Sequence, residues 1–271
     1  MSRPSTLTDF AALEAALEEK RAAVEAALPG LLRRGAPEVD AAVEYSLLAP
    51  AKRVRPLLTL MVAELFRLEP RLVLPAACAV EMAHTASLIL DDLPSMDDAQ
   101  LRRGRATCHR VHGEANAVLA AFALLNRAFE LLAEGWPGGP DGPLRAALAR
   151  ELAGAVGTEG MIAGQARDLA VTDREIDFAT LEFIHSRKTG ALFVACAAMG
   201  AVAAAASPAD TAAIKAYAKN LGLAFQIVDD LIDVTGASQE AGKDVGQDLK
   251  KTTFVSFSGV EGAGQLAREL A

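Results

Sequence analysis

The stretch that decides the fold is Ile89-Leu90-Asp91-Asp92-Leu93-Pro94-Ser95-Met96-Asp97-Asp98, in which four carboxylates follow an apolar run. That run, Ala76 to Leu90, consists mostly of small and aliphatic residues and contains no proline or glycine, so we predict a buried helix. Pro94 cannot continue a helix. The carboxylates therefore fall at the C-terminal end of the predicted helix and on the turn that follows it.

Carboxylates are unfavourable at this position for two reasons. They repel one another, and they lie at the negative end of the helix dipole. At ~4 Å and an effective dielectric constant of about 20, each like-charged pair costs on the order of 4 kcal/mol. A bound cation would relieve this repulsion, and ligands that are all oxygen favour Mg²⁺ before Ca²⁺. Taken alone, the stretch is equally consistent with an acidic surface turn.

A second acidic cluster lies far downstream, in Phe225-Gln226-Ile227-Val228-Asp229-Asp230-Leu231-Ile232-Asp233. Asp229 and Asp233 are four residues apart, so they share one face of a helix. Two such clusters facing each other across a helical cavity would bind several Mg²⁺ ions and, through these ions, a diphosphate. Both clusters are far less likely to occur together by chance than either one alone.

The composition indicates a single all-α domain spanning residues 1–271. The chain has 271 residues, of which 52% are hydrophobic and 5% aromatic. This is enough for one large core. Alanine and leucine, both strong helix formers, are abundant. The net charge of −8 argues against nucleic acid as a partner. It does not exclude an anionic substrate, because metal ions held by carboxylates invert the local field.

Targeting signals and paired cysteines are not apparent in the sequence. Cys78, Cys108 and Cys196 are scattered and are expected to be core residues in a reducing compartment, which favours the cytoplasm. The first ten residues lack the pattern of a signal peptide. The segment closest to a membrane span, Ala191 to Ala206, is short and alanine-dominated, so we expect a buried core helix rather than a membrane-spanning one.

Apolar periodicity and helix-breaking residues predict the positions of the helices. The expected ranges are 8–28, 38–48, from the basic turn at 52–56 to about 66, 76–90, 115–134, 144–156, 181–206 and 209–234. Within 160–169, the glycines allow close helix contact, and Gln165 and Asp168 form a polar pair one turn apart.

Basic residues gather at two places near these carboxylates. Lys52-Arg53-Val54-Arg55 opens a helix, and an N-terminus with cations beside it favours an anion. Leu101-Arg102-Arg103-Gly104-Arg105 follows the first acidic cluster, where arginines would hold the remaining oxygens of a metal-bound phosphate. A solvated turn and plain salt bridges are the respective alternatives.

Two further polar positions interrupt apolar helices. His84 lies two turns before Asp91 on the same face and is either a ligand-binding residue or a hydrogen-bonded core histidine. Lys188-Thr189 lies inside the apolar 181–206 segment, where its partner is either a phosphate or a buried carboxylate.

Together these motifs resemble those of the trans-isoprenyl diphosphate synthases, the polyprenyl synthetase family. The first motif has the form DDxxxxD (Asp91, Asp92, Asp97) and the second DDxxD (Asp229, Asp230, Asp233). The resemblance runs from about residue 40 to residue 260. It implies the isoprenoid synthase fold, a bundle of ten or more helices around a deep central cavity, usually as a homodimer.

The resemblance also implies roles for individual residues. Metal binding, with three Mg²⁺ per active site, would fall to Asp91, Asp92, Asp97, Asp229 and Asp233. The allylic diphosphate would be held by Arg102, Lys188, Thr189, Gln226 and Lys243. Isopentenyl diphosphate would be held by Lys52, Arg55, His84 and Arg103. The implied reaction is ionisation of the allylic C–O bond, attack by the double bond of isopentenyl diphosphate and loss of a proton. Of these residues, Asp91, Asp97, Arg102, Lys188 and Asp229 would act most directly in catalysis.

The chain departs from the family pattern in three places. The family usually has Gly-Gly where this chain has Pro50-Ala51, which puts the role of Lys52 in question. Lys250 stands where glycine is common. The sequence also stops at Ala271, so we expect a shortened C-terminal region.

Product length depends on the residues just before Asp91, because only a steric floor can stop chain growth when each buried CH₂ favours the longer chain by roughly 0.8 kcal/mol. Farnesyl-forming relatives commonly place an aromatic residue at the positions of Ser87 and Ala86, which are small here. Ala83, one turn deeper, is also small, and Met82 is the nearest bulky side chain. We therefore expect geranylgeranyl diphosphate, with farnesyl diphosphate as the alternative.

Two other classes of protein remain as competitors. A class I terpene cyclase normally carries Asn/Asp, Ser/Thr and Glu in its second motif, whereas this chain has Asp229 to Asp233. A regulatory subunit of a heteromeric synthase tends to lose one acidic motif, and both are intact here. Turnover by the protein alone with Mg²⁺ would separate these possibilities.

Overall fold

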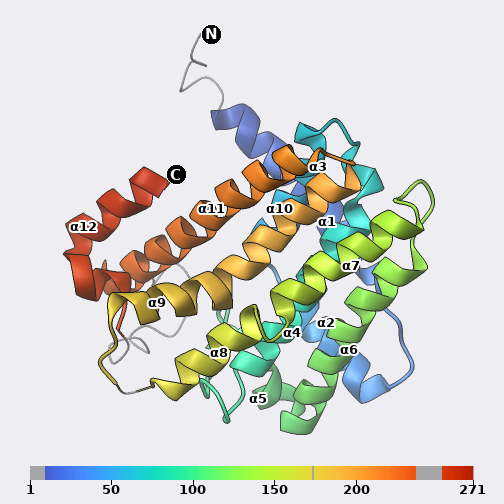
Figure 1. Ribbon diagram of the computed structural model, residues 1–271. Coiled ribbons are helices and arrows are strands. Elements are labelled where there is room, and N and C mark those ends of the chain that lie inside the picture. Colours follow the sequence, from blue (N-terminus) through green and yellow to red (C-terminus); the bar gives the residue numbers. More distant parts are fainter. Residues whose placement is uncertain (1–9, 173, 236–251, 271) are drawn as a thin grey trace.

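The computed structural model describes residues 10–172, 174–235 and 252–270, and it is built almost entirely of helices (Figure 1). The elements in chain order are α1 (Phe10–Leu31), α2 (Pro37–Leu47), α3 (Val54–Leu65), η1 (Pro70–Leu72), α4 (Leu74–Asp91), β1 (Leu101–Arg102), β2 (Arg105–Ala106), α5 (Cys108–His112), α6 (Glu114–Glu134), α7 (Gly142–Val156), α8 (Met161–Ala170), α9 (Phe178–His185), η2 (Ser186–Gly190), α10 (Ala191–Ala203), α11 (Pro208–Thr235) and α12 (Phe254–Leu270). The all-α prediction is confirmed.

Most predicted helix bounds agree with the structure to within two or three residues, but several expectations were incomplete. No helix had been predicted at α5 or at α12. The first helix continues past Pro29 to Leu31. The segment expected as one helix over 181–206 is divided into α9, the π-helical turn η2 and α10. A two-stranded antiparallel hairpin, β1–β2, had not been expected.

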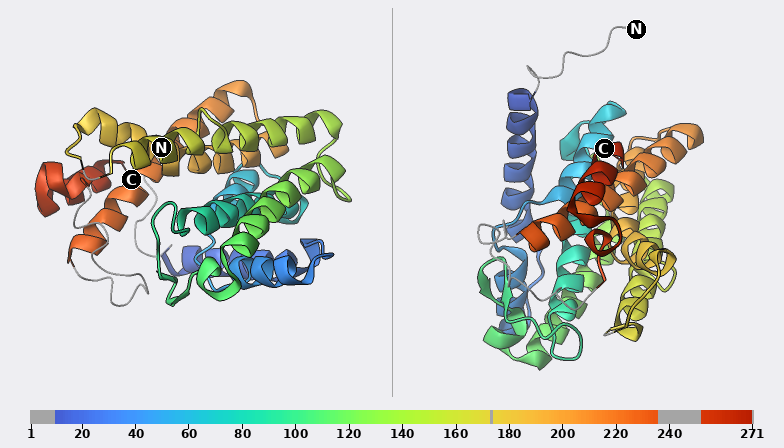
Figure 2. Two further views of the ribbon diagram at one scale, coloured as in Figure 1. Left: turned by 90° about the horizontal axis from the view of Figure 1, so that it is seen from below. Right: turned by 90° about the vertical axis from the view of Figure 1, so that its left-hand side faces the viewer.

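Helix α4 lies at the centre of the molecule. It packs most extensively against α6 and also contacts α1, α2 and α3. The view from below shows α1 and α2 on one side of this central layer and α7, α8, α10 and α11 on the other (Figure 2). The alanines explain the close approach, because α4 and α6 meet through small buried side chains that leave little room between their backbones. These are Ala76, Ala77, Ala79 and Ala83 of α4 and Ala117, Ala120, Ala121 and Ala128 of α6.

Two hydrophobic clusters stabilise the fold. The larger one surrounds α4 and draws on residues from α1 to α11. The smaller one joins α9, α11 and α12 through Leu181, Ile227, Phe254, Ala263 and Ala267. The larger cluster therefore fixes the end of α4, and the smaller one fixes the second acidic helix against α12.

Among the described helices, α6 alone is long and apolar enough to cross a membrane by length and composition. This is weak evidence, because a core helix of a globular protein passes the same test. One face of α6 packs against α4 through buried residues such as Ala120, Leu124 and Leu131. That face accounts for much of its apolar composition.

Candidate active site

The first acidic motif lies at the end of α4, as its proline predicts. Asp91 is the last residue of the helix and Asp92 is its C-cap. The turn then folds back on the helix, because Asp97 N–H donates to the Asp91 carbonyl oxygen at 3.0 Å and Ala99 N–H donates to the Asp92 carbonyl oxygen at 3.2 Å. Burial raises the pKa of the Asp91 carboxyl, and the charge of Asp97 adds to this effect while Lys188 opposes it. The turn thus concentrates negative charge at one point.

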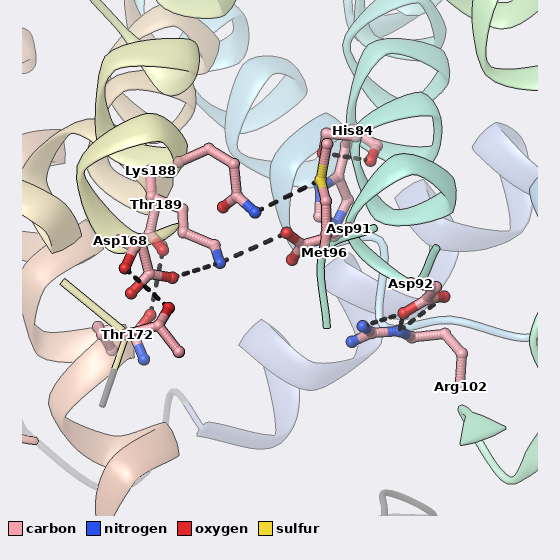
Figure 3. A network of polar contacts seen from close by, with 12 residues as sticks. His84, Asp91, Asp92, Met96, Arg102, Asp168, Thr172, Lys188 and Thr189 are labelled. Carbon is pink, nitrogen blue, oxygen red and sulfur yellow. Dashed lines mark hydrogen bonds and ion pairs between the residues drawn. The ribbon is translucent and has the colours of Figure 1, made fainter. Parts of the chain in front are cut away.

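A lysine from η2 reaches this acidic turn. Lys188 Nζ lies 3.4 Å from Asp91 Oδ1 and 2.9 Å from Asp168 Oδ2, so its ammonium bridges α4 and α8 (Figure 3). Burial acts to lower the pKa of Lys188, but the surrounding carboxylates Asp91 and Asp168 leave it raised. Asp168 was not assigned to the site from the sequence. The feature of the sequence that could have indicated Asp168 is its polar pair with Gln165, one turn apart on α8.

Glycines on two sides allow η2 to occupy this place. A Cβ on Gly164 of α8 would lie 2.2 Å from the Lys188 backbone nitrogen. A Cβ on Gly222 of α11 would lie 3.2 Å from the Gly190 Cα atom. The close helix contact predicted for the glycines of 160–169 is therefore confirmed at Gly164. π-Helical turns are rare and often occur at functional sites, and here the turn presents Lys188 and Thr189 on adjacent positions.

A chain of hydrogen bonds connects η2 with the second acidic motif. Thr189 Oγ1 donates to Gln226 Oε1 at 3.1 Å, and Gln226 Nε2 donates to Asp230 Oδ1 at 3.0 Å. The other carboxylate oxygen of Asp230 accepts from the backbone N–H of Phe254 at 3.0 Å, at the start of α12. Asp230 is thus a buried structural residue. Asp229 and Asp233 are only partly buried and keep their predicted position on another face of α11.

The charges of four arginines act on His84, which lies two turns before Asp91 on α4. Burial lowers the pKa of His84 well below its ordinary value, and the positive charges of Arg55, Arg103, Arg102 and Arg53 lower it further. His84 Nε2 lies 3.0 Å from Arg55 Nη1. A neutral imidazole that accepts at Nε2 explains this contact, with the proton on Nδ1.

Two of these arginines have positive charge that the protein does not neutralise directly. In the described part of the chain, neither Arg55 nor Arg103 forms an ion pair with a carboxylate. Arg55 Nε is also buried without a hydrogen-bond partner there. Burial lowers the pKa of Arg103, and the neighbouring arginines contribute in the same direction. Unpaired buried cations are costly, so this cluster is suited to binding an anion.

The hairpin β1–β2 positions Arg102 and Arg103, which follow the first acidic motif. Its two turn residues, Arg103 (φ 55°) and Gly104 (φ 73°), are both left-handed, as a two-residue hairpin loop requires. Arg102 makes a bidentate contact with Asp92, with Nε 2.9 Å from Oδ1. Arg102 therefore forms a salt bridge, which was the alternative to phosphate binding considered for these arginines. Its charge also acts on Asp91 and Asp97.

Not all predicted residues are brought together. Lys52 is exposed and lines a separate cleft of about 660 Å³ between α1, α3 and α11, and no contact joins it to Arg55 or His84 in the described residues. Its predicted role in diphosphate binding stays a prediction. Lys243 lies outside the described residues, as does Lys250.

The residues predicted to set product length differ in exposure. Met82, Ala83 and Ala86 are buried in the main hydrophobic cluster. Ser87 is partly exposed, and its hydroxyl donates to the His84 carbonyl oxygen at 2.7 Å. Of the two positions before Asp91, Ser87 is therefore the one that borders open space.

The donor set is suited to Mg²⁺ with help from a substrate. Within the described ranges, no three acidic, histidine or cysteine side chains converge closely enough to hold a metal alone. Mg²⁺ is usually bound by one or two carboxylates together with phosphate oxygens and water. Asp91 and Asp97 would be the carboxylates of such a site. The Lys188 ammonium occupies a position between Asp91 and Asp168 that attracts positive charge.

The chain is similar to known proteins over most of its length. Residues 36–265 match the family model described as polyprenyl synthetase. Over 99% of its length, the chain is 42% identical to the heterodimeric geranylgeranyl pyrophosphate synthase large subunit 1, chloroplastic, of Arabidopsis thaliana, and it spans 73% of that protein. It spans 66% and 63% of two other plant relatives.

Bacterial proteins are similarly close. The chain is 42% identical to farnesyl diphosphate synthase of Geobacillus stearothermophilus, over 93% of this chain and 86% of the relative. The structure of the geranyltransferase from Helicobacter pylori, complexed with magnesium and isoprenyl diphosphate, matches with a TM-score of 0.85 at 30% identity. That match covers 100% of this chain and 89% of the other.

Proposed function

The chain belongs to the polyprenyl synthetase family, and we propose that it condenses isopentenyl diphosphate with allylic diphosphates in a Mg²⁺-dependent prenyltransferase reaction. The observation that carries this proposal is that two sites of opposite charge lie close to each other along α4. An acidic turn at Asp91 and Asp97 faces Lys188. Two turns earlier, His84 lies among arginines, of which Arg55 and Arg103 form no ion pair in the described part of the chain. One site suits a metal-bound diphosphate and the other a second diphosphate.

Bound Mg²⁺, which we propose to number three per site, would neutralise the departing diphosphate. Asp91 and Asp97 would hold two of the ions and Asp229 the third, with Asp92 and Asp233 as outer or alternate ligands. The allylic diphosphate would be bound by Lys188, which lies beside Asp91, and by the hydrogen-bonded pair Thr189 and Gln226. Arg102 would join them by leaving Asp92. These charges stabilise the negative charge that develops on the leaving group.

Arg55, Arg103 and His84 would hold isopentenyl diphosphate, whose double bond forms the new C–C bond as the allylic C–O bond breaks. The diphosphate leaves with the electron pair of the broken C–O bond, and the cation that results from C–C bond formation loses one proton to this diphosphate. Water must be excluded while the allylic cation exists, because it would be captured as an alcohol. The apolar positions that flank Asp91 on α4, such as Leu90 and Ile89, contribute to that exclusion.

We propose geranylgeranyl diphosphate as the end product, because Ala83, Ala86 and Ser87 leave no aromatic floor on α4. Farnesyl diphosphate is the second candidate, since the bacterial relative named above carries that activity in its name. The name of the plant relative describes a large subunit of a heterodimer. A non-catalytic regulatory subunit is the third candidate, opposed by the two intact acidic motifs.

We also propose a homodimer. One apolar face of α5 and α6 is exposed, comprising Val111, Val118, Leu119 and Phe122, of which Phe122 is 75% exposed. We call this set the α6 apolar face. Large exposed apolar groups gathered on one helix are typical of a protein interface, and the opposite side of α6 already packs in the core.

A product assay tests the proposed function. The purified protein is incubated with Mg²⁺, isopentenyl diphosphate and each of the five-, ten- and fifteen-carbon allylic diphosphates, and the dephosphorylated products are sized by mass spectrometry. A twenty-carbon end product supports the whole proposal. A fifteen-carbon product retains the reaction and overturns the argument from Ala86 and Ser87. A folded protein without turnover would favour the regulatory subunit.

A further inference from the structure

Arg53 follows Lys52 in the basic turn. Its charge contributes to the arginine cluster around His84, but its guanidinium donates to acceptors of the protein itself. Arg53 is 3% exposed, donates hydrogen bonds to three acceptors, and its Nε lies 3.8 Å from Glu25 Oε1 of α1. Nη1 donates to Glu81 Oε1 at 2.7 Å, and Nη2 donates to the carbonyl oxygens of Leu47 at 2.8 Å and Ala49 at 2.9 Å. Glu81, on α4, is 1% exposed.

This arrangement costs the protein free energy. Arg53 is the N-cap of α3 and has a left-handed backbone, with φ at 52°, which is unfavourable for a long side chain such as arginine. Two charges are also withdrawn from water, and a buried ion pair of this kind often stabilises a fold no more than an apolar pair of similar size. Stability alone therefore does not account for the Arg53–Glu81 pair.

The location of the pair suggests what it does. Glu81 and His84 are three residues apart on the same side of α4, and they contact Arg53 and Arg55, respectively. The basic turn is thereby attached to α4 at two consecutive points. Asp91 lies on the same helix, about 15 Å beyond Glu81 at 1.5 Å per residue. A rigid helix thus fixes the spacing between the basic turn and the acidic turn.

We propose that Arg53 and Glu81 are positioning residues, which hold Arg55 and the basic turn at a set distance from the first acidic motif and so place isopentenyl diphosphate for attack on the allylic carbon. This inference rests on the proposed function. It goes beyond it by assigning a specific task to two buried residues that touch neither substrate. Because the reaction needs the two reacting carbons within contact of each other, a small displacement of one diphosphate site lowers the rate steeply.

The charge of Glu81 has a second consequence at the same place. It acts on both Arg55 and Arg103, raising the pKa of each against the larger lowering effect of burial. Glu81 therefore offsets part of the positive charge of Arg55 and Arg103, while its own hydrogen bond goes to Arg53. Removal of its charge is expected to disturb the isopentenyl diphosphate site and to leave the Lys188–Asp168 site, which lies on other elements, as it is.

The experiment compares Glu81→Gln, which preserves size and removes the charge, with the wild-type protein. We expect KM for isopentenyl diphosphate to rise about tenfold or more, while KM for the allylic diphosphate changes by less than about threefold. Binding of isopentenyl diphosphate without an allylic substrate, measured by calorimetry, should weaken in parallel. A matched control is Arg127→Gln, which removes another buried arginine that binds a carbonyl oxygen and two glutamates remote from the acidic turn. It should lower Tm without changing either KM.

A second variant, Arg53→Met with Glu81→Met, keeps the test valid if Glu81→Gln fails to fold. An apolar pair can replace a buried ion pair with little loss of stability, so we expect a folded protein with the same selective loss. Unchanged binding of isopentenyl diphosphate in folded variants, or equal changes in both KM values, would overturn the positioning role. Failure of the wild-type protein to turn over any substrate pair would instead overturn the proposed function.

Discussion

Asp91 offers the most direct test of metal binding at the scale of single residues. The Asp91→Asn variant keeps the size of the side chain and removes the charge that would hold Mg²⁺. We expect kcat to fall by about 10² to 10⁴-fold, because the leaving diphosphate loses electrostatic stabilisation. Steady-state assays at saturating Mg²⁺ measure the loss, and circular dichroism checks that the helices remain.

Asp98 supplies the matched control, since it lies in the same turn but is exposed and has a left-handed backbone (φ 45°) that asparagine tolerates. Asp98→Asn should retain near-normal turnover. Near-normal turnover in Asp91→Asn as well would remove Asp91 from the metal site.

Ser87 and Ala86 separate product length from core packing. Ser87 is partly exposed, whereas Ala86 is 2% exposed within the main cluster. Ser87→Phe is therefore expected to shorten the product to fifteen carbons or fewer with little loss of stability. Ala86→Phe should lower the free energy of unfolding by about 1–3 kcal/mol through overpacking. Products are sized by mass spectrometry and stability by urea unfolding. An unchanged product from Ser87→Phe would place the floor on another helix.

His84 makes stability depend on pH in a defined direction. Its folded pKa lies well below the ordinary value of 6.5, so the unfolded chain binds this proton more readily than the folded one. The stabilisation is therefore complete above pH 6.5 and is lost as the pH falls from there toward the folded pKa. Urea unfolding between about pH 5.5 and 7.5 should show a steeper loss in the wild type than in His84→Gln. Identical pH profiles would contradict the neutral, arginine-surrounded imidazole.

Single residues also show the limits of sequence analysis. The shared helix face of Asp229 and Asp233 could be predicted from their spacing, and Asp230 was not among the predicted metal ligands. That Asp230 accepts from the N-terminus of α12 could not be predicted, because the partner lies 24 residues away in sequence. Asp168 was noted only for its spacing from Gln165. Its contact with Lys188 depends on how α8 packs against η2, which local periodicity does not encode.

At the scale of elements, the contact between α8 and η2 determines where Lys188 lies. In Gly164→Ala the new methyl group would lie 2.2 Å from the Lys188 backbone nitrogen, so η2 must shift away from α8. We expect KM for the allylic diphosphate to rise about tenfold, because Lys188 and Thr189 move with the backbone. Kinetics with each substrate varied in turn measures this change.

Gly154→Ala is the control, since its added Cβ meets nothing within 4 Å on α7. There alanine should stabilise the helix by about 0.5–1 kcal/mol and leave both KM values unchanged. If Gly164→Ala behaves in the same way, the close contact does not position the site.

Elements were predictable where the side-chain pattern is long and regular. The helix expected over 76–90 is observed as Leu74–Asp91, because Pro75 and Pro94 limit it at either end. The π-helical turn η2 was missed, since one extra residue per turn barely alters the apolar pattern of the segment that contains it. The hairpin β1–β2 has two residues per strand, too few for alternation to be recognised.

At the scale of the whole molecule, the abundance of alanine explains why the acidic turn is reached from several helices. Small side chains let α4 lie close to α6, and glycines let η2 lie close to α8 and α11. Backbones this close together place Asp91, Asp168 and Lys188 within contact although they are far apart in sequence. Composition predicted an all-α core, but it could not predict which helices would meet at the end of α4.

The α6 apolar face gives the prediction that concerns the assembled protein. We expect Phe122→Asp to convert the proposed dimer into a monomer, because a charge would be buried opposite its own copy across a two-fold interface. Light scattering after size-exclusion chromatography measures the mass in solution. The control is Leu65→Asp, which places the same charge on an equally prominent apolar side chain (64% exposed) at the end of α3. It should leave the mass unchanged.

The Phe122→Asp variant also tests whether α6 is apolar because it binds a membrane or because it forms a subunit interface. If α6 served a membrane, the wild-type protein would sediment with lipid vesicles and Phe122→Asp would abolish this association. If the face is a subunit interface, the wild type stays in the supernatant as a dimer and the variant stays there as a monomer. Because α4 packs on the opposite side of α6, loss of the dimer should also lower Tm, since the central layer loses support on one side. A monomeric wild-type protein that remains in the supernatant would overturn the homodimer.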